Sequence, residues 1–209
     1  MCRHLGETAM SFFAHWQYAM ASDEVAQREF AAESGFCPVH TWQLAAVSSP
    51  QGLSLGYPNL VERLAKRLAY LLGTPETDPS AIQTLVPGPL ECRVCELRRQ
   101  TERAYVPQLV TFLDNDLGRQ VYAKGHGLCL RHLGTLAEAA PKDLREFLVT
   151  HAMRRFEEMA EDMRSYALKR DAIRRELSNR NEESAHVLAI IHIVGESRVC
   201  MPWRQDGEM

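Results

Sequence analysis

The chain has 209 residues, of which 45% are hydrophobic and 24% are charged, a composition typical of a globular protein rather than a disordered one. Its formal net charge of −3 argues against a protein whose main role is to coat nucleic acid. The N-terminus carries no apolar signal segment, and the longest apolar stretch, Ala185–Val194, is too short to span a membrane. We therefore expect a cytoplasmic protein without membrane association, whose six cysteines are metal ligands or reduced thiols.

Helical periodicity dominates the chain, and no stretch shows the alternation of a half-buried strand. The first half predicts four helices, at Leu5–Ala21, Asp23–Glu33, Pro38–Val47 and Pro58–Leu72. The second half predicts five, at Glu96–Leu113, Leu117–Ala123, Leu130–Ala139, Pro141–Leu177 and Glu182–Val194. The expected fold class is therefore all-α, with a long C-terminal helix and a final apolar helix that closes the core.

A proline-rich segment separates the two halves. Between Gly73 and Glu91 the periodicity is weak and four prolines occur, a composition typical of a linker. We expect a first helical unit at 1–73, a linker at 74–91, a second unit with the long C-terminal helices at 92–199, and a polar tail at 200–209.

The long C-terminal helix is predicted to be amphipathic. Apolar side chains recur every three or four residues from Leu144 to Leu177, which places them on one side of the helix. The other side mixes acidic and basic residues at ion-pair spacing. We interpret this side as a solvated surface above a helix-packing seam, and not as a nucleic-acid patch.

One short pattern, Gly-x-Cys-x-x-His followed by Leu-Ala, occurs twice. Its first copy begins at Gly35 and contains Cys37 and His40, and its second begins at Gly127 and contains Cys129 and His132. When these copies are aligned, Cys2 falls opposite Cys95 with a slippage of one residue. We interpret the chain as a degenerate internal repeat whose two units pack against each other.

The second half contains a complete set of metal ligands. Cys92, Cys95, Cys129 and His132 together supply three thiolates and one imidazole, which suit a tetrahedral zinc ion. Both ligand pairs fall at predicted helix N-termini, where free N–H groups and the helix dipole stabilise a thiolate. An antiparallel helical hairpin between the pairs would bring them together, and Gly125 and Gly127 would permit the turn before Cys129.

Zinc is favoured over the alternatives by the ligand types. A Cys3His set can also hold an iron–sulfur cluster, although all-cysteine ligation is the common arrangement. A thioredoxin-like redox role for Cys92 and Cys95 lacks the βαβ setting that such a role requires.

The first half supplies only three matching ligands, Cys2, Cys37 and His40. Three explanations stay open: a fourth ligand lies upstream of Met1, His4 is the fourth ligand, or the site has decayed into a packed core. Cys200, in the polar tail, is interpreted as a spare thiol.

Two Cys-x-x-Cys and Gly-x-Cys-x-x-His units in an all-helical chain resemble an uncharacterised, bacterial-type family defined by a domain of unknown function. Cys92, Cys95, Cys129 and His132 match its second unit, and Cys2, Cys37 and His40 match part of its first. The resemblance implies an architecture and a set of metal ligands, and it implies no activity.

The expected function is that of a metal-binding helical protein with a structural, interaction or regulatory role. A saturated Cys3His shell leaves no open position for a substrate, and no hydrolase triad, phosphate-binding loop or dinucleotide fingerprint occurs, so we favour a non-enzymatic protein. The expected partner is another protein or a second copy of the chain. The alternative function is an iron–sulfur or thiol-based redox protein that uses Cys92, Cys95, Cys129 and His132.

Overall fold

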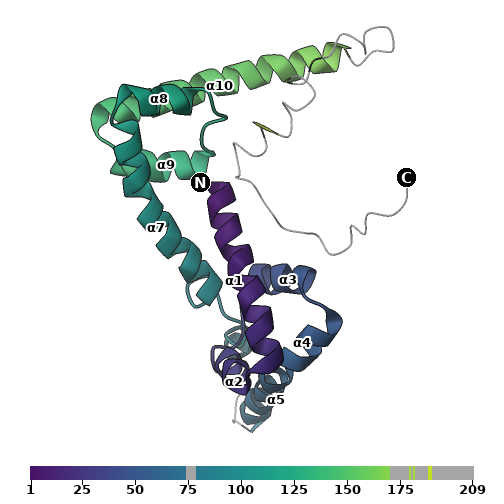
Figure 1. Cartoon of the computed structure of the whole chain (residues 1–209). Helices are drawn as coiled ribbons and strands as arrows, with labels where there is room; N and C mark the ends of the chain where they lie inside the picture. Colours follow the sequence, from purple (N-terminus) through teal and green to yellow (C-terminus); the bar gives the residue numbers. More distant parts are fainter. Residues whose placement is uncertain (74–78, 170–178, 180, 182–187, 190–209) are drawn as a thin grey trace. The chain divides into compact units, whose positions relative to one another are not determined.

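The computed structural model describes residues 1–73, 79–169, 179, 181 and 188–189. All regular structure in these residues is helical, which confirms the all-α prediction (Figure 1). None of the described helices has the length and apolarity needed to cross a membrane. Except for residues 188 and 189, the expected final helix at Glu182–Val194 lies outside the described residues, as does Cys200.

The described part of the chain contains ten helices. They are α1 (Cys2–Ser22), α2 (Glu24–Ala32), α3 (Pro38–Val47), α4 (Pro50–Gly56), α5 (Pro58–Leu72), α6 (Pro79–Gln83), α7 (Arg93–Leu113), α8 (Asp116–Ala123), α9 (Leu130–Ala139) and α10 (Lys142–Lys169).

Two of these helices, α4 and α6, were not predicted, and both are short. Ser49 is the N-cap of α4, and its hydroxyl accepts a hydrogen bond from the Gly52 amide at 3.0 Å. Pro50 follows at the first helical position, so a cap and a proline begin this helix without any apolar periodicity. α6 lies within the expected linker.

Contacts divide the chain into two compact units. The unit that we call the aromatic unit contains Leu5–Thr101, and the unit that we call the aliphatic unit contains Met1–His4 together with the described residues from Glu102 onwards. Both α1 and α7 therefore supply residues to each unit. The domain boundaries that we expect from the sequence remain predictions.

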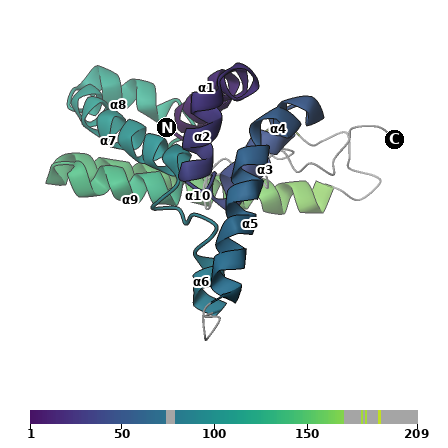
Figure 2. The ribbon, with the colours of Figure 1, turned by 90° about the horizontal axis from the view of Figure 1, so that it is seen from below.

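The core of the aromatic unit is built from stacked and edge-on rings. Phe13, Phe30 and Phe36 are almost completely buried, and the ring centroids of Phe30 and Phe36 are 5.0 Å apart. Trp16 contacts Phe30 with centroids 6.0 Å apart. α2 packs against α5 beside this core (Figure 2). Rings of this size bury more apolar area than any aliphatic side chain, so this cluster provides the stable base on which α3 and the start of α7 rest.

The core of the aliphatic unit lies between α7, α9 and α10. Leu113, Leu136, Leu144 and Leu148 are fully buried there, and α9 packs against α10. The predicted apolar stripe of α10 is buried at Leu144, Leu148 and Met159, and the first two of these belong to this core. Another side of the helix carries exposed ion pairs, such as Arg164 with Glu161 at 3.3 Å, in agreement with the predicted amphipathic pattern.

Gly118 in α8 allows a close approach between two segments of backbone. A Cβ atom at this position would overlap the carbonyl oxygen of Phe112, at the end of α7. By contrast, a Cβ atom at Gly134 in α9 would meet nothing within 4 Å. Only the first of these two helical glycines is therefore required by packing.

Replacing Gly118 by alanine should lower the free energy of unfolding by about 1–3 kcal/mol, because the new methyl group displaces backbone that cannot move freely. Gly134→Ala is the matched control and should leave stability unchanged or raise it by up to about 1 kcal/mol, through the better helix propensity of alanine. Urea denaturation followed by circular dichroism measures both. Equal effects of the two substitutions would contradict the packing argument.

Candidate metal centres

The first Cys-x-x-His pair lies at the start of α3. Cys37 is the N-cap of this helix, with φ −60° and ψ 161°, and its side chain makes no capping hydrogen bond. The preceding Gly35 has φ +79°, a left-handed conformation that favours glycine, and its amide donates to the carbonyl of Phe30 at 3.0 Å. The turn leaves the Cys37 thiol free to face His40, which lies one turn further along the helix.

The Cys-x-x-Cys pair lies at the start of α7. Cys92 directly precedes the helix, and its carbonyl accepts from the Glu96 amide at 3.0 Å. Cys95 lies inside the first turn, because α7 begins at Arg93 and not at Glu96 as predicted. A spacing of three residues places both thiols on the same side of the helix start.

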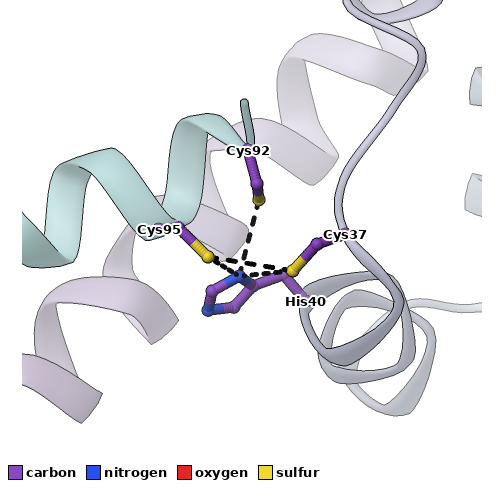
Figure 3. A group of neighbouring side chains, drawn as sticks. All are labelled: Cys37, His40, Cys92 and Cys95. Carbon is purple, nitrogen blue, oxygen red and sulfur yellow. Dashed lines mark hydrogen bonds between the residues drawn. The ribbon is translucent and has the colours of Figure 1, made fainter. Parts of the chain in front are cut away.

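These four side chains converge on one point (Figure 3). The Nδ1 atom of His40 lies 3.2 Å from the sulfur of Cys37, 3.5 Å from that of Cys92 and 3.3 Å from that of Cys95. The sulfurs of Cys37 and Cys95 are 3.8 Å apart. In a tetrahedral zinc site, neighbouring sulfurs are about 3.8 Å apart, and a sulfur and a nitrogen are about 3.6 Å apart. The four donor atoms therefore lie close to the corners of such a site.

The predicted grouping of ligands was wrong. The sequence favoured Cys92 and Cys95 with Cys129 and His132, but the structure places Cys92 and Cys95 with Cys37 and His40 in the aromatic unit. The reason is that both Cys-x-x-His turns offer the same two donors. Packing between distant helices decides which turn receives the α7 cysteines, and no local spacing encodes that choice.

Arg93 fixes the start of α7 within the aromatic unit. Its guanidinium forms an ion pair with Glu33, lies 4.0 Å from Glu29, and sits over the Trp16 ring at 5.0 Å from the centroid. Cation–π contact and ion pairing at one side chain hold the helix start against α1 and α2. Cys92 directly precedes Arg93 in the sequence, so these contacts also hold Cys92 in place, and its side chain is fully buried.

Burial gives the three thiols of this cluster very different acidities. The pKa of Cys95 is raised to about 12 by burial and by the negative charge of Cys92 and Cys37. Burial also raises the pKa of Cys37. At Cys92, hydrogen bonds from His40 and from backbone amides outweigh burial and lower the pKa to about 6. Near neutral pH and without a cation, the cluster therefore holds one thiolate and two protonated thiols.

The second cluster lies in the aliphatic unit and consists of Cys2, Cys129 and His132. The sulfur of Cys2 is 3.5 Å from that of Cys129 and 3.0 Å from Nδ1 of His132, and Cys129 lies 3.2 Å from the same nitrogen. Cys129 is the N-cap of α9, with φ −68° and ψ 158°, and Gly127 before it has φ +79°. Gly125 does not have a positive φ, so only one of the two predicted glycines makes the special turn.

His4 does not join the second cluster. Its ring packs on that of Tyr105, with centroids 5.1 Å apart. Among the described residues, no fourth cysteine, histidine or acidic side chain offers an atom within 4.8 Å of all three donor atoms of Cys2, Cys129 and His132.

Glu102 is a neighbour of the second cluster that sequence reasoning missed. Its Oε1 atom lies 3.3 Å from Nε2 of His132, on the side of the ring away from the sulfurs, and its Oε2 atom accepts from Arg131 at 2.8 Å. The Glu102 side chain is only 11% exposed. Glu102 belongs to α7 and His132 to α9, so no sequence spacing indicates this contact. A carboxylate behind a ligating histidine fixes which ring nitrogen carries the proton and makes the other a better ligand.

Comparison with known proteins gives one match. The sequence model of a family of unknown function, DUF6062, matches residues 1–195. No curated protein and no solved structure matches the chain.

In the metal-free protein, ultraviolet thiolate absorbance should rise by one thiolate per chain as the pH is raised through about 6, because Cys92 is the one cysteine among the described residues whose pKa is lowered to that range. The substitution Cys92→Ser should abolish this step, whereas Cys200→Ser, the matched control, should keep it. A thiolate step near pH 6 that persists in Cys92→Ser would contradict the assignment.

Proposed function

The chain belongs to the DUF6062 family, whose function is unknown, and we propose that it is a zinc-binding protein in which the ion has a structural role. The proposed ligands of this ion are Cys37, His40, Cys92 and Cys95. The observation that carries the proposal is the convergence of two buried thiols, one half-buried thiol and one imidazole nitrogen at tetrahedral spacing.

Charge supports a bound dication at this cluster. The three thiols lie so close together that ionisation of one opposes ionisation of its neighbours. A zinc ion removes this conflict, because it binds all three as thiolates and releases the two remaining thiol protons to solvent. One buried and one half-buried protonated thiol beside a buried histidine pack no better than apolar side chains would.

Donor spacing also favours a single ion over an iron–sulfur cluster. All four donor atoms lie within 4.8 Å of one another. Cysteines that bind different irons of a cluster are held further apart than ligands that share one ion. The redox alternative, a cluster or a thiol switch, is therefore the second candidate, and the metal content decides between them.

The proposed site is saturated by protein ligands, so its role is to hold the chain together and not to activate a substrate. In a reducing cytoplasm, where we place the protein, a disulfide between these segments would not persist, and a zinc ion provides the same constraint. It joins the turn before α3 to the start of α7, which the sequence separates by 55 residues between His40 and Cys95.

An interaction role is supported by the surface next to this site. α3 directs His40 inward, whereas its Trp42 side chain is 56% exposed. Trp42 borders an apolar hollow formed with Tyr57, Leu53 and Ala45 from α3, α4 and the residue after α4. Exposed aromatic side chains beside an apolar depression are typical of surfaces that contact another protein or a second copy of the chain.

We also include an internal duplication in the proposal. The support is local: the two Cys-x-x-His turns share an N-cap cysteine, a glycine at φ +79° two residues earlier, and a following helix of ten residues. Leu44 and Leu136, at equivalent positions of these helices, are both buried.

Cys95→Ser should lower the zinc content by one ion per chain and destabilise the protein by about 4 kcal/mol, which corresponds to a fall of about 10 °C in melting temperature. Inductively coupled plasma mass spectrometry and thermal denaturation measure the two effects. Cys200→Ser is the matched control and should change neither. Purification under argon also tests the redox alternative, since an iron–sulfur protein would be brown and would contain iron instead of zinc.

An unchanged zinc content and an unchanged melting curve in Cys95→Ser would disprove the structural zinc site.

A further inference from the structure

We propose that Cys2, Cys129 and His132 form a second metal site, with three protein ligands and a fourth position that accepts an exogenous thiolate. Glu102 is the positioning residue of this site. The inference concerns a different unit and different residues from the structural zinc site, and it does not depend on that site.

The donor atoms of Cys2, Cys129 and His132 are those of a metal site. Two sulfurs and one imidazole nitrogen lie 3.0–3.5 Å from one another, which corresponds to one face of a tetrahedron. In the described part of the chain, no fourth cysteine, histidine, aspartate or glutamate offers an atom within 4.8 Å of all three donors. Three protein ligands with one free position are the arrangement of zinc sites that bind an external ligand, whereas four protein ligands characterise structural sites.

Cys2 is the partly buried donor of this cluster, whereas Cys129 and His132 are buried. In the first cluster Cys95 is likewise partly buried, and its other three donors are buried. We therefore expect an exogenous ligand of the second site to approach at Cys2.

The kind of ligand follows from a comparison of the two clusters. Both Cys-x-x-His turns have the same backbone conformation. Two further cysteines join the turn in the aromatic unit, whereas one further cysteine, Cys2, joins it in the described part of the aliphatic unit. A dication bound by two thiolates and a neutral imidazole carries no net charge, so it can still accept an anion. An exogenous thiolate would reproduce the Cys3His donor set of the other cluster.

Glu102 supports this site. Its Oε1 atom lies 3.3 Å from Nε2 of His132, behind the imidazole, while Nδ1 is the nitrogen that faces the sulfurs. A carboxylate placed behind the imidazole increases its donor strength, which suits a site with one thiolate fewer.

The reaction is a ligand exchange without redox change. The thiol loses its proton to the buffer, its sulfur forms a bond to the metal, and the bond between the metal and a water molecule breaks. The oxidation state of the metal and of every sulfur stays the same.

Cobalt(II) tests the proposal, because its visible spectrum reports the number of thiolate ligands. The full-length chain is loaded with cobalt under argon and titrated with 2-mercaptoethanol. The thiolate-to-cobalt charge-transfer absorbance should rise in the wild type, and it should not rise in Cys2→Ala. The thioether 2-(methylthio)ethanol, which cannot form a thiolate, is the matched ligand control and should have no effect.

Glu102→Gln tests the positioning role. It should weaken cobalt binding at the second site about tenfold and shift the d–d bands of that site, with the first site unchanged. Glu158→Gln, at an exposed ion pair of α10, is the matched control and should alter neither site. Equal affinities in the wild type and Glu102→Gln would remove Glu102 from the proposal.

Two results would overturn the inference: a folded Cys95→Ser chain that binds no cobalt, or bound cobalt in that variant whose spectrum the thiol does not change. If Cys95→Ser folds poorly, the difference spectrum between the wild type and Cys2→Ala provides the same measurement. A thiol response that is present in the wild type, lost in Cys2→Ala and accompanied by unchanged metal content in Cys95→Ser would contradict the structural zinc site and support this one.

Discussion

The aromatic unit is subject to one electrostatic constraint, because three thiols, two of them buried and one half-buried, lie within reach of a single point. Thiols so close together cannot all ionise without a cation. When they stay protonated, their burial beside a histidine adds little to the stability of the fold. The rest of the aromatic unit is organised around this point. The ring core supports the turn before α3, and Arg93 holds the start of α7 against α1 and α2. Packing thus brings the ligands together before any metal contributes.

The chain completes each Cys-x-x-His turn with a helix start from the other half of its sequence. The α7 cysteines meet His40 across 52 and 55 residues, and Cys2 meets Cys129 across 127. Closing loops of this length costs conformational entropy, and one short contact does not offset that cost. The cost grows only slowly with loop length. Helices and their capping turns are local and can form first. The two Cys/His clusters require the long-range contacts between helices, so a metal bound there would stabilise an arrangement that the cores also favour.

This distinction explains what could be predicted from the sequence. The amphipathic helices, the seven ligand residues and the turn at Gly127 all leave local signals, namely periodicity, residue type and spacing. The pairing of ligands leaves none, because either Cys-x-x-His turn could complete the Cys92 and Cys95 pair chemically. A helical hairpin from Cys95 to Cys129 was plausible by length, and only the packing of α3 and α7 excludes it. Glu102 escaped prediction for the same reason, since its importance comes from a neighbour on another helix.

The two clusters also show how the same turn can support different chemistry. In the aromatic unit the imidazole of His40 has three sulfur neighbours. In the aliphatic unit His132 has two sulfur neighbours, and a carboxylate held by Arg131 lies behind the ring. A dication bound by three thiolates would carry an excess negative charge, and a further carboxylate beside it would be unfavourable. A dication bound by two thiolates would be neutral, and there a carboxylate would strengthen the nitrogen donor at little electrostatic cost. The position of Glu102 therefore fits the proposal that the second cluster binds a metal with one thiolate fewer than the first.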